Sequence, residues 1–164
     1  MKLLKKFFIL LSFLNLTLFV SINGFAADTM VNPIAERNKA QFSQAKDLID
    51  KKNYQQATVI LQELLKDSDN AKDADILNYY AFSQRKLKHF DVAETYYLKA
   101  LTIKPNHPGA NEYLGELYLE TKRPEKAKER LEVLKSCNCN EFKLLKANID
   151  KYNPSVPFVP TSSW

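Results

Sequence analysis

The sequence has few of the residues on which enzyme active sites depend. It contains 3 glycines in 164 residues, and Gly24, Gly109 and Gly115 lie too far apart to form a glycine-rich phosphate-binding loop. It contains 2 histidines. His89 and His107 are both expected in turns, and neither stands near an arranged nucleophile in the sequence. We therefore expect a protein that is not an enzyme and that has no cofactor and no metal site.

The sequence also lacks an uninterrupted apolar run long enough to span a membrane. Residues 7–22 are mostly apolar but include polar residues, and the run is shorter than the roughly 20 apolar residues that a span needs. Lysines precede the run, and Gly24 and Ala26 follow it at positions that suit a signal peptidase. We expect residues 1–26 to be a cleavable signal peptide, cut after Ala26, and the mature protein to be periplasmic. The alternative is an uncleaved signal that anchors the chain in the inner membrane.

A strong basic charge is absent from the expected mature chain. The full sequence has a net charge of +5, but three of its lysines and none of its acidic residues lie in residues 1–26. Nucleic-acid binding requires a clustered basic face, and none is evident. We expect no nucleic-acid partner, and no stable membrane insertion once the signal has been removed.

One pattern recurs along the rest of the chain. Small residues mark each copy twice, at spacings of 36 and then 34 residues in both series. The first series is Ala45, Ala81 and Gly115, and the second is Ala57, Ala93 and Ala127. Apolar residues around them follow steps of three and four, which is typical of amphipathic helices. A repeated helix–turn–helix unit of this length predicts an array of stacked hairpins.

The middle and third copies resemble the tetratricopeptide repeat. The resemblance rests on Leu77, Tyr80, Ala81, Ala93, Tyr97, Ala100 and Pro105, and then on Leu114, Gly115, Ala127 and Leu131. The first copy is weaker, because Gln44 stands where a large apolar residue is usual and Asp69 where proline is usual. The resemblance implies an all-α fold, a right-handed helical-hairpin solenoid of three repeats with a C-terminal capping helix. It also implies a protein-binding role.

The repeats divide the expected mature chain into a linker, a repeat domain and a tail. The linker is expected over 27–37, the domain over 38–152 and a proline-rich extended tail over 153–164. Within the domain we expect repeats at about 38–71, 74–107 and 108–139 and the capping helix at 141–152. In the middle repeat we expect helices over about 75–86 and 92–103, with Asp91 capping the second helix and Glu94 completing a capping box.

The resemblance further implies a concave groove lined by the first helix of each hairpin, which we call its A helix. The positions expected to line it are Phe42, Lys46, Ile49, Asn78, Phe82, Arg85, Glu112, Glu116, Leu119 and Glu120. Phe82 is the expected exposed aromatic anchor. Glu112, Glu116 and Glu120 share one helix face, which predicts a solvated acidic stripe and a docking place for a basic segment of a partner.

Two cysteines stand between the third repeat and the capping helix. Cys137 and Cys139 meet an oxidising compartment in an exported protein. Three interpretations remain open: a disulfide in a small, strained ring that is easily reduced, a pair of thiolates for a soft metal such as Cu(I), and a local structural staple. They give the alternative function, a thiol-dependent accessory protein in metal handling or redox chemistry.

The tail has two open interpretations. Pro154, Pro157 and Pro160 exclude a helix and favour an extended strand. The tail is either disordered or docks on the array or on a partner through Phe158, Val159 and Trp164. Taken together, the sequence predicts a non-catalytic adaptor or assembly module of the periplasm, which binds a protein or peptide in the groove of its A helices.

Overall fold

The computed structural model describes residues 32–161. The expected signal peptide, its cleavage site after Ala26 and the last three residues of the tail lie outside the described residues. Within the described part all regular secondary structure is helical, which confirms the expected all-α fold class. None of the described helices combines the length and the apolar character that crossing a membrane requires.

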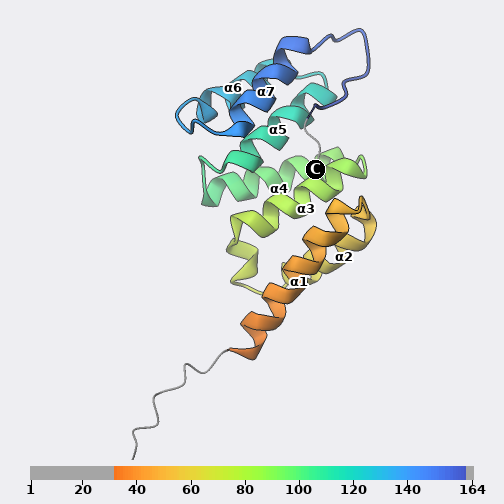
Figure 1. Cartoon of the computed structure of the whole chain (residues 1–164), viewed down its shortest axis with the longest axis vertical. Coiled ribbons are helices and arrows are strands. Elements are labelled where there is room, and N and C mark those ends of the chain that lie inside the picture. The colour runs from red at the N-terminus through yellow and green to blue at the C-terminus, as the bar shows by residue number, and fades with distance from the viewer. Residues whose placement is uncertain (1–31, 162–164) are drawn as a thin grey trace, which may run out of the picture. The chain divides into compact units, whose positions relative to one another are not determined.

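Seven α-helices and one short 3-10 helix follow one another along the chain (Figure 1). They are α1 (Pro33–Asp50), α2 (Tyr54–Leu64), η1 (Asn70–Lys72), α3 (Ala74–Lys86), α4 (Phe90–Ile103), α5 (Pro108–Glu120), α6 (Pro124–Leu134) and α7 (Asn140–Lys151). The first helix begins at Pro33, so the end of the stretch expected as a linker is helical. Asn32 explains this start, because its side chain accepts hydrogen bonds from the backbone N–H groups of Ile34 and Ala35.

The helices form hairpins that stack in chain order. The pairs α1–α2, α3–α4 and α5–α6 pack within each hairpin, and α2 packs on α3 and α4 on α5 between hairpins. The last helix, α7, packs on both α5 and α6 and covers the third hairpin. The A helices are α1, α3 and α5. They also contact one another in sequence, α1 with α3 and α3 with α5, so their side chains form one continuous face.

The starts of the helices in the middle repeat differ from the prediction in one respect. Asp73 caps α3, because its Oδ1 accepts hydrogen bonds from the N–H groups of Asp75 and Ile76. By contrast, α4 begins at Phe90, and its N-cap residue, His89, makes no side-chain capping bond. Asp91 therefore lies inside the first turn, and the expected capping box with Glu94 does not form. Glu94 instead accepts two hydrogen bonds from the guanidinium of Arg123.

A lysine with positive φ stands in the turn of each hairpin. Lys52, Lys88 and Lys122 have φ angles of 60°, 66° and 59°. Helices commonly end in this left-handed conformation, but glycine is the usual residue. A lysine costs roughly 1–2 kcal/mol more there because its Cβ approaches the carbonyl oxygen. The three turns therefore share a left-handed backbone conformation at the same position, as expected for regular repeats.

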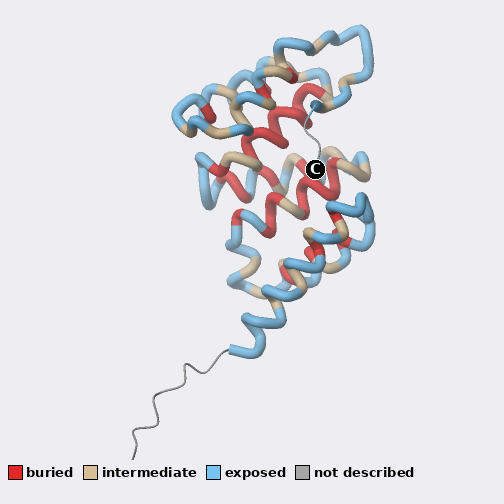
Figure 2. Tube along the Cα trace, viewed as in Figure 1, coloured by how far each residue is buried: buried red, intermediate tan, exposed pale blue. Residues whose placement is uncertain are grey.

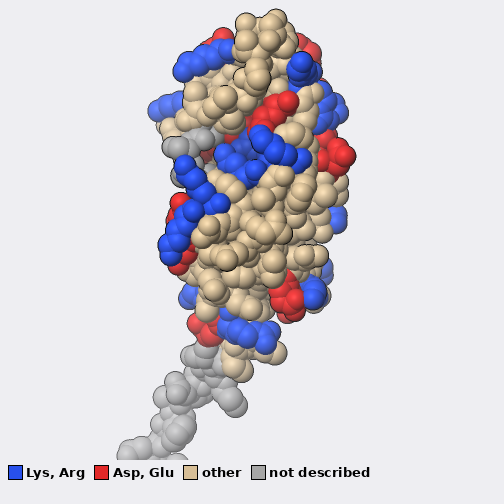
Figure 3. Space-filling model, turned by 90° about the vertical axis from the view of Figure 1, so that its right-hand side faces the viewer, with Lys and Arg blue, Asp and Glu red and all other residues tan. Residues whose placement is uncertain are grey.

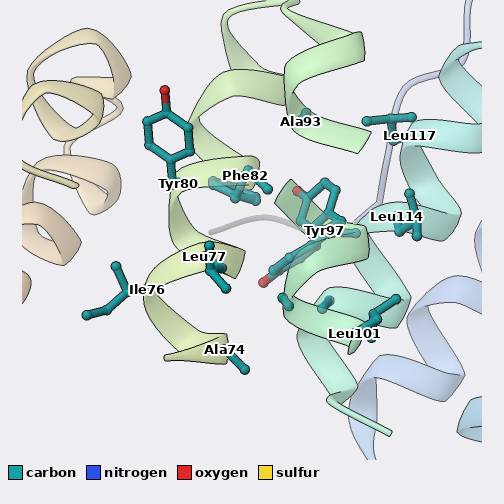
Figure 4. Close-up of a cluster of buried hydrophobic side chains, with 14 of the residues drawn as sticks. Ala74, Ile76, Leu77, Tyr80, Phe82, Ala93, Tyr97, Leu101, Leu114 and Leu117 are labelled. Atoms are coloured by element: carbon teal, nitrogen blue, oxygen red, sulfur yellow. The ribbon is translucent and has the colours of Figure 1, made fainter. Parts of the chain in front are cut away.

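The small residues of the repeat lie where helices approach most closely. Ala45, Ala81, Ala57, Ala93 and Ala127 are all fully buried. At Gly115 of α5, a Cβ atom would lie 2.6 Å from both methyl carbons of Leu145 of α7. Buried residues concentrate on α3 and α5 (Figure 2), and Phe82, Tyr97 and Leu114 project into the space between α3, α4 and α5 (Figure 4). Glycine at position 115 therefore lets α7 sit directly on α5.

Candidate functional site

The expected groove residues lie on the face formed by α1, α3 and α5. We call this face the A-helix face; it carries Phe42, Lys46, Asn78, Phe82, Arg85, Glu112, Glu116 and Glu120. Its two ends differ sharply in burial. Phe42 and Lys46 of α1 are half-buried, whereas Asn78, Phe82, Arg85, Glu112 and Glu116 are buried. Ile49 and Leu119 are buried as well, so much of this face is not open surface.

Phe82 was expected as an exposed anchor, and the structure corrects this. Its side chain is 1 % exposed. Its ring centroid lies 6.1 Å from that of Tyr54 on α2 and 4.9 Å from that of Tyr113 on α5. The guanidinium of Arg85 lies over the Phe82 and Tyr113 rings at 5.6 and 5.7 Å. Phe82 therefore joins neighbouring repeats within the array.

Arg85 forms the centre of a buried ion-pair network. Its Nη2 donates to Oε2 of Glu116 at 2.7 Å, and its Nη1 donates to Oε1 of Glu120 at 3.0 Å. Lys88 donates to the other oxygen of Glu120 at 3.1 Å. Burial lowers the pKa of the Arg85 guanidinium, but the Tyr97 hydroxyl and the two carboxylates outweigh burial and raise it. The guanidinium stays charged.

The acidic stripe expected on α5 is thus not a solvated stripe. Two of its three carboxylates are neutralised by cations of the preceding repeat. In the view of Figure 3, several Lys and Arg side chains lie together in the upper half of the molecule, with acidic side chains beside them. A docking place for a basic partner segment therefore has no support from Glu116 and Glu120 in this state.

Asn148 of α7 extends the network to the tail. Its Nδ2 donates to Oε1 of Glu116 at 2.7 Å. Its Oδ1 accepts from the backbone N–H of Thr161 at 2.9 Å and from the Thr161 hydroxyl at 2.6 Å. A continuous chain of polar contacts therefore runs from Arg85 through Glu116 and Asn148 to Thr161. Sequence reasoning missed Asn148, because it lies beside the apolar stripe that was used to place the capping helix.

Glu112 is the third member of the stripe and has a different environment. It is 1 % exposed, and its Oε1 has no hydrogen-bond partner. Burial, Glu116 on the same helix and Glu141 on α7 raise the pKa of Glu112 to about 8, while Arg85 on α3 opposes them. Asn78, at the equivalent position of α3, also has a buried Oδ1 without a partner. Buried polar atoms are normally hydrogen-bonded, so both positions depart from the usual pattern, as does the buried Nε of Arg85.

The first-repeat end of the A-helix face is the accessible end. The ring of Phe42 meets that of Tyr79 on α3 edge-on at 5.3 Å between centroids, and Nζ of Lys46 lies 5.1 Å from the Phe42 ring centroid. A cavity of about 330 Å³ adjoins Phe42. Its lining is completed by Asn32, Ile34, Ala35, Asn38, Lys39, Asp67, Asp69, Asn70, Asp73 and Ile76. This end combines an aromatic ring, a cation and open volume.

The two cysteines form a disulfide in the structure. Cys137 and Cys139 are joined directly after α6, and Cys139 is the N-cap residue of α7. This arrangement agrees with a staple that fixes the start of the capping helix. The thiol-dependent alternative would first need reduction of this bond. Among residues 32–161, no group of three or more His, Cys, Asp or Glu side chains is placed to hold a metal ion.

Stacked helical hairpins with a continuous A-helix face define this molecule as a helical-repeat protein. Residues 85–149 match the family model of the tetratricopeptide repeat. The resemblance seen in the sequence is thereby confirmed.

Solved structures of the same fold cover most of the chain. The Yersinia enterocolitica type III secretion translocator chaperone SycD aligns with a TM-score of 0.62 and 18 % identity, over 73 % of this chain and 91 % of that one. SycD in complex with a peptide of the translocator YopD aligns with a TM-score of 0.61 and 18 % identity, over 73 % and 92 %. The Arabidopsis OM64 TPR domain aligns with a TM-score of 0.63 and 18 % identity, over 72 % and 98 %. No curated protein sequence matches the chain.

Proposed function

We propose that this protein is an exported, non-catalytic adaptor that binds a segment of another protein on its A-helix face. The observation that carries the proposal is the first-repeat end of this face, where Phe42 lines a cavity of about 330 Å³ and Lys46 lies over the Phe42 ring. Support also comes from the SycD structure, which holds a peptide of the translocator YopD. The mechanism is presentation of a rigid surface, with no chemical step.

The proposal assigns the binding energy to Phe42 and Lys46. Aromatic side chains partly sunk into a surface are typical interface anchors. Phe42 fits this description, because Tyr79 holds its ring from one side and the cavity opens beside it. Lys46 offers a cation next to the ring. The proposed partner segment therefore places an apolar side chain in the cavity and an acidic group near Lys46.

A capture experiment tests the proposal. The mature chain, the Phe42→Ala/Lys46→Glu variant and a control are immobilised and exposed to a periplasmic extract. The control is Val59→Ala/Lys104→Glu, which makes the same kinds of change at exposed positions of α2 and after α4. We expect the native chain and the control to recover the same partner and the A-helix-face variant to lose it. Circular dichroism checks that all three proteins fold.

Two results would count against this function. If all three proteins recover the same partner, binding does not use the first-repeat end of the A-helix face. If none recovers a partner, the chain is not an adaptor in that compartment. The compartment itself is tested by the mass of the protein purified from cells. Export with cleavage after Ala26 predicts a chain that starts at Ala27, and a chain that retains residues 1–26 supports the membrane-anchored alternative.

A further inference from the structure

The described part of the tail folds back on the array. After α7 the chain turns at Asn153, whose side-chain Oδ1 accepts from the N–H of Ser155 and whose backbone carbonyl accepts from the N–H of Val156. The segment then loops outward and returns toward the end of α5 (Figure 1). The proline-rich sequence suits this path, because an extended strand without internal hydrogen bonds spans distance with few residues.

Two contacts hold this segment in place. Phe158 is half-buried, and its ring centroid lies 6.3 Å from that of Tyr152 at the end of α7. The N–H and the hydroxyl of Thr161 both donate hydrogen bonds to Oδ1 of Asn148. Between these contacts Val159 is 79 % exposed and contributes little. The attachment is therefore concentrated at an aromatic residue and at a hydroxyl residue three positions later.

Space remains beneath the segment. A pocket of about 290 Å³ separates it from the end of α5, lined by Leu119, Glu120 and Lys122 on one side and by Tyr152 and residues 154–158 on the other. A segment that is fixed at two points over an unfilled pocket can be exchanged for another chain more readily than one that packs along its whole length. The contacts it makes are also of a kind that any extended peptide can supply.

The attachment point of Thr161, Asn148 of α7, is hydrogen-bonded to a residue of the A-helix face. The Asn148 side chain is hydrogen-bonded both to Thr161 and to Glu116. Glu116 in turn forms an ion pair with Arg85. Whatever occupies the Thr161 position therefore contacts the same polar network that connects α3, α5 and α7. The segment is held there at the high effective concentration that covalent linkage provides, on the order of millimolar for short flexible connections.

We propose that residues 153–161 are a built-in occupant of the α7 end of the A-helix face, which a partner segment of the same chemistry displaces. That partner segment is extended and flanked by prolines, and it carries an aromatic residue followed three positions later by Ser or Thr. This inference rests on the proposed function, because it assigns the class of partner and the regulation of the same face. The free protein is then self-occupied at one end and open at the other.

The test uses a fluorescein-labelled peptide with the sequence of residues 153–161 as the probe. Its affinity is measured by fluorescence anisotropy for the native mature chain, for a Phe158→Ala/Thr161→Ala release variant and for a Ser155→Ala/Val159→Ala control in the same segment. Removing the internal competitor should tighten peptide binding to the release variant by roughly tenfold or more. The control should bind as the native chain does. Equal affinity for all three proteins, or no binding to the release variant, would overturn the proposal.

Amide hydrogen exchange on the native chain gives a second, mutation-free test. The Thr161 N–H should exchange at least roughly tenfold more slowly than the same N–H in the isolated peptide, since it is hydrogen-bonded to Asn148. Exchange at the rate of the isolated peptide would overturn the proposal. The two failures can be told apart. Equal peptide affinity for the native chain, the release variant and the control refutes this inference but leaves partner capture by the native chain intact. Failure of the native chain to capture any partner refutes the adaptor function itself.

Discussion

The helices α1 and α5 occupy the same place in their repeats but meet very different surroundings. α1 buries 2 of its 18 residues, Ala45 and Ile49, while α5 buries 10 of 13. The difference comes from neighbours, since α5 contacts α3, α4, α6 and α7 and α1 contacts chiefly α2 and α3. Equivalent positions in a repeat sequence therefore do not have equivalent exposure.

The consequence for charged residues is direct. On α1, Lys46 stays half-buried at the surface and needs no partner. On α5, Glu116 has no exposed side-chain surface, and a buried charge must be paired to be tolerated. Cations and amides from α3 and α7 supply this pairing. The first repeat thus keeps an adaptable surface, whereas the third repeat is fixed by internal contacts.

The largest expected effect on stability comes from removing the buried ion pairs of Arg85, which connect α3 to α5. Arg85→Leu removes the cation from buried Glu116 and half-buried Glu120, and removing one partner of a buried ion pair typically costs about 3–5 kcal/mol. Urea unfolding followed by circular dichroism measures this loss. The control Lys46→Ala on α1 should change stability by no more than about 0.5 kcal/mol. A double variant, Arg85→Leu/Glu116→Leu, should be more stable than Arg85→Leu alone, and equal costs at Arg85 and Lys46 would erase the contrast.

Among the packing contacts, that of α7 with α5 has the largest expected effect. In Gly115→Ala the new methyl group would meet both Leu145 methyl carbons at 2.6 Å. Overpacking of this kind costs about 1–3 kcal/mol, partly offset by the better helix propensity of alanine. We expect a net loss of about 1–2 kcal/mol in thermal unfolding. Gly109→Ala is the matched control, since its nearest contact would be 3.3 Å from a flexible Asn78 side chain. Additional replacement of Leu145 by Ala should make the Gly115→Ala change nearly neutral.

Glu112 gives the fixed end a dependence on pH. The pKa of its carboxyl rises from 4.5 to about 8 on folding, so the folded state holds a proton that the unfolded chain has lost. The free energy of unfolding should therefore fall as pH rises from about 4.5 to about 8, and then level off. Glu112→Gln stays neutral, so it should gain several kcal/mol over the native chain at about pH 9, at about 1.4 kcal/mol for each unit by which folding raises the pKa, and little at about pH 4. Glu63→Gln, at an exposed position of α2, should show no such divergence.

The disulfide has the smallest expected effect. It closes a ring over a sequence separation of 2, and the chain-entropy estimate for so short a loop is about 1.6 kcal/mol. Cys137→Ser/Cys139→Ser should lower stability by at most this amount and leave partner capture unchanged. Thermal unfolding with and without reductant provides the comparison. Loss of capture by a folded double variant would favour the thiol-dependent function instead.

The repeats could be predicted from the sequence, whereas the side-chain contacts between repeats could not. Small residues at Ala81, Ala93 and Gly115 predicted the hairpins because close packing of helices has a local sequence signature. The Arg85–Glu116 pair has none, since its partners are 31 residues apart and pair only once α3 and α5 are stacked. The only sequence signal for this ion pair was an arginine on one A helix and a row of glutamates on the next. The contact between Asn148 and the tail was even harder to predict from the sequence, because it depends on the path of the proline-rich segment in space.

The polar chain from Arg85 through Glu116 and Asn148 to Thr161 gives the array a direction. A stack in which each hairpin contacts only its neighbours can fray from both ends. Here the C-terminal end is fastened across α3, α5, α7 and the tail, and the N-terminal end has no comparable chain among the described residues. Fraying should therefore begin at α1 and α2 and stop at α3. The part of the molecule on which we propose that a partner binds is also the part that can loosen without unfolding the rest.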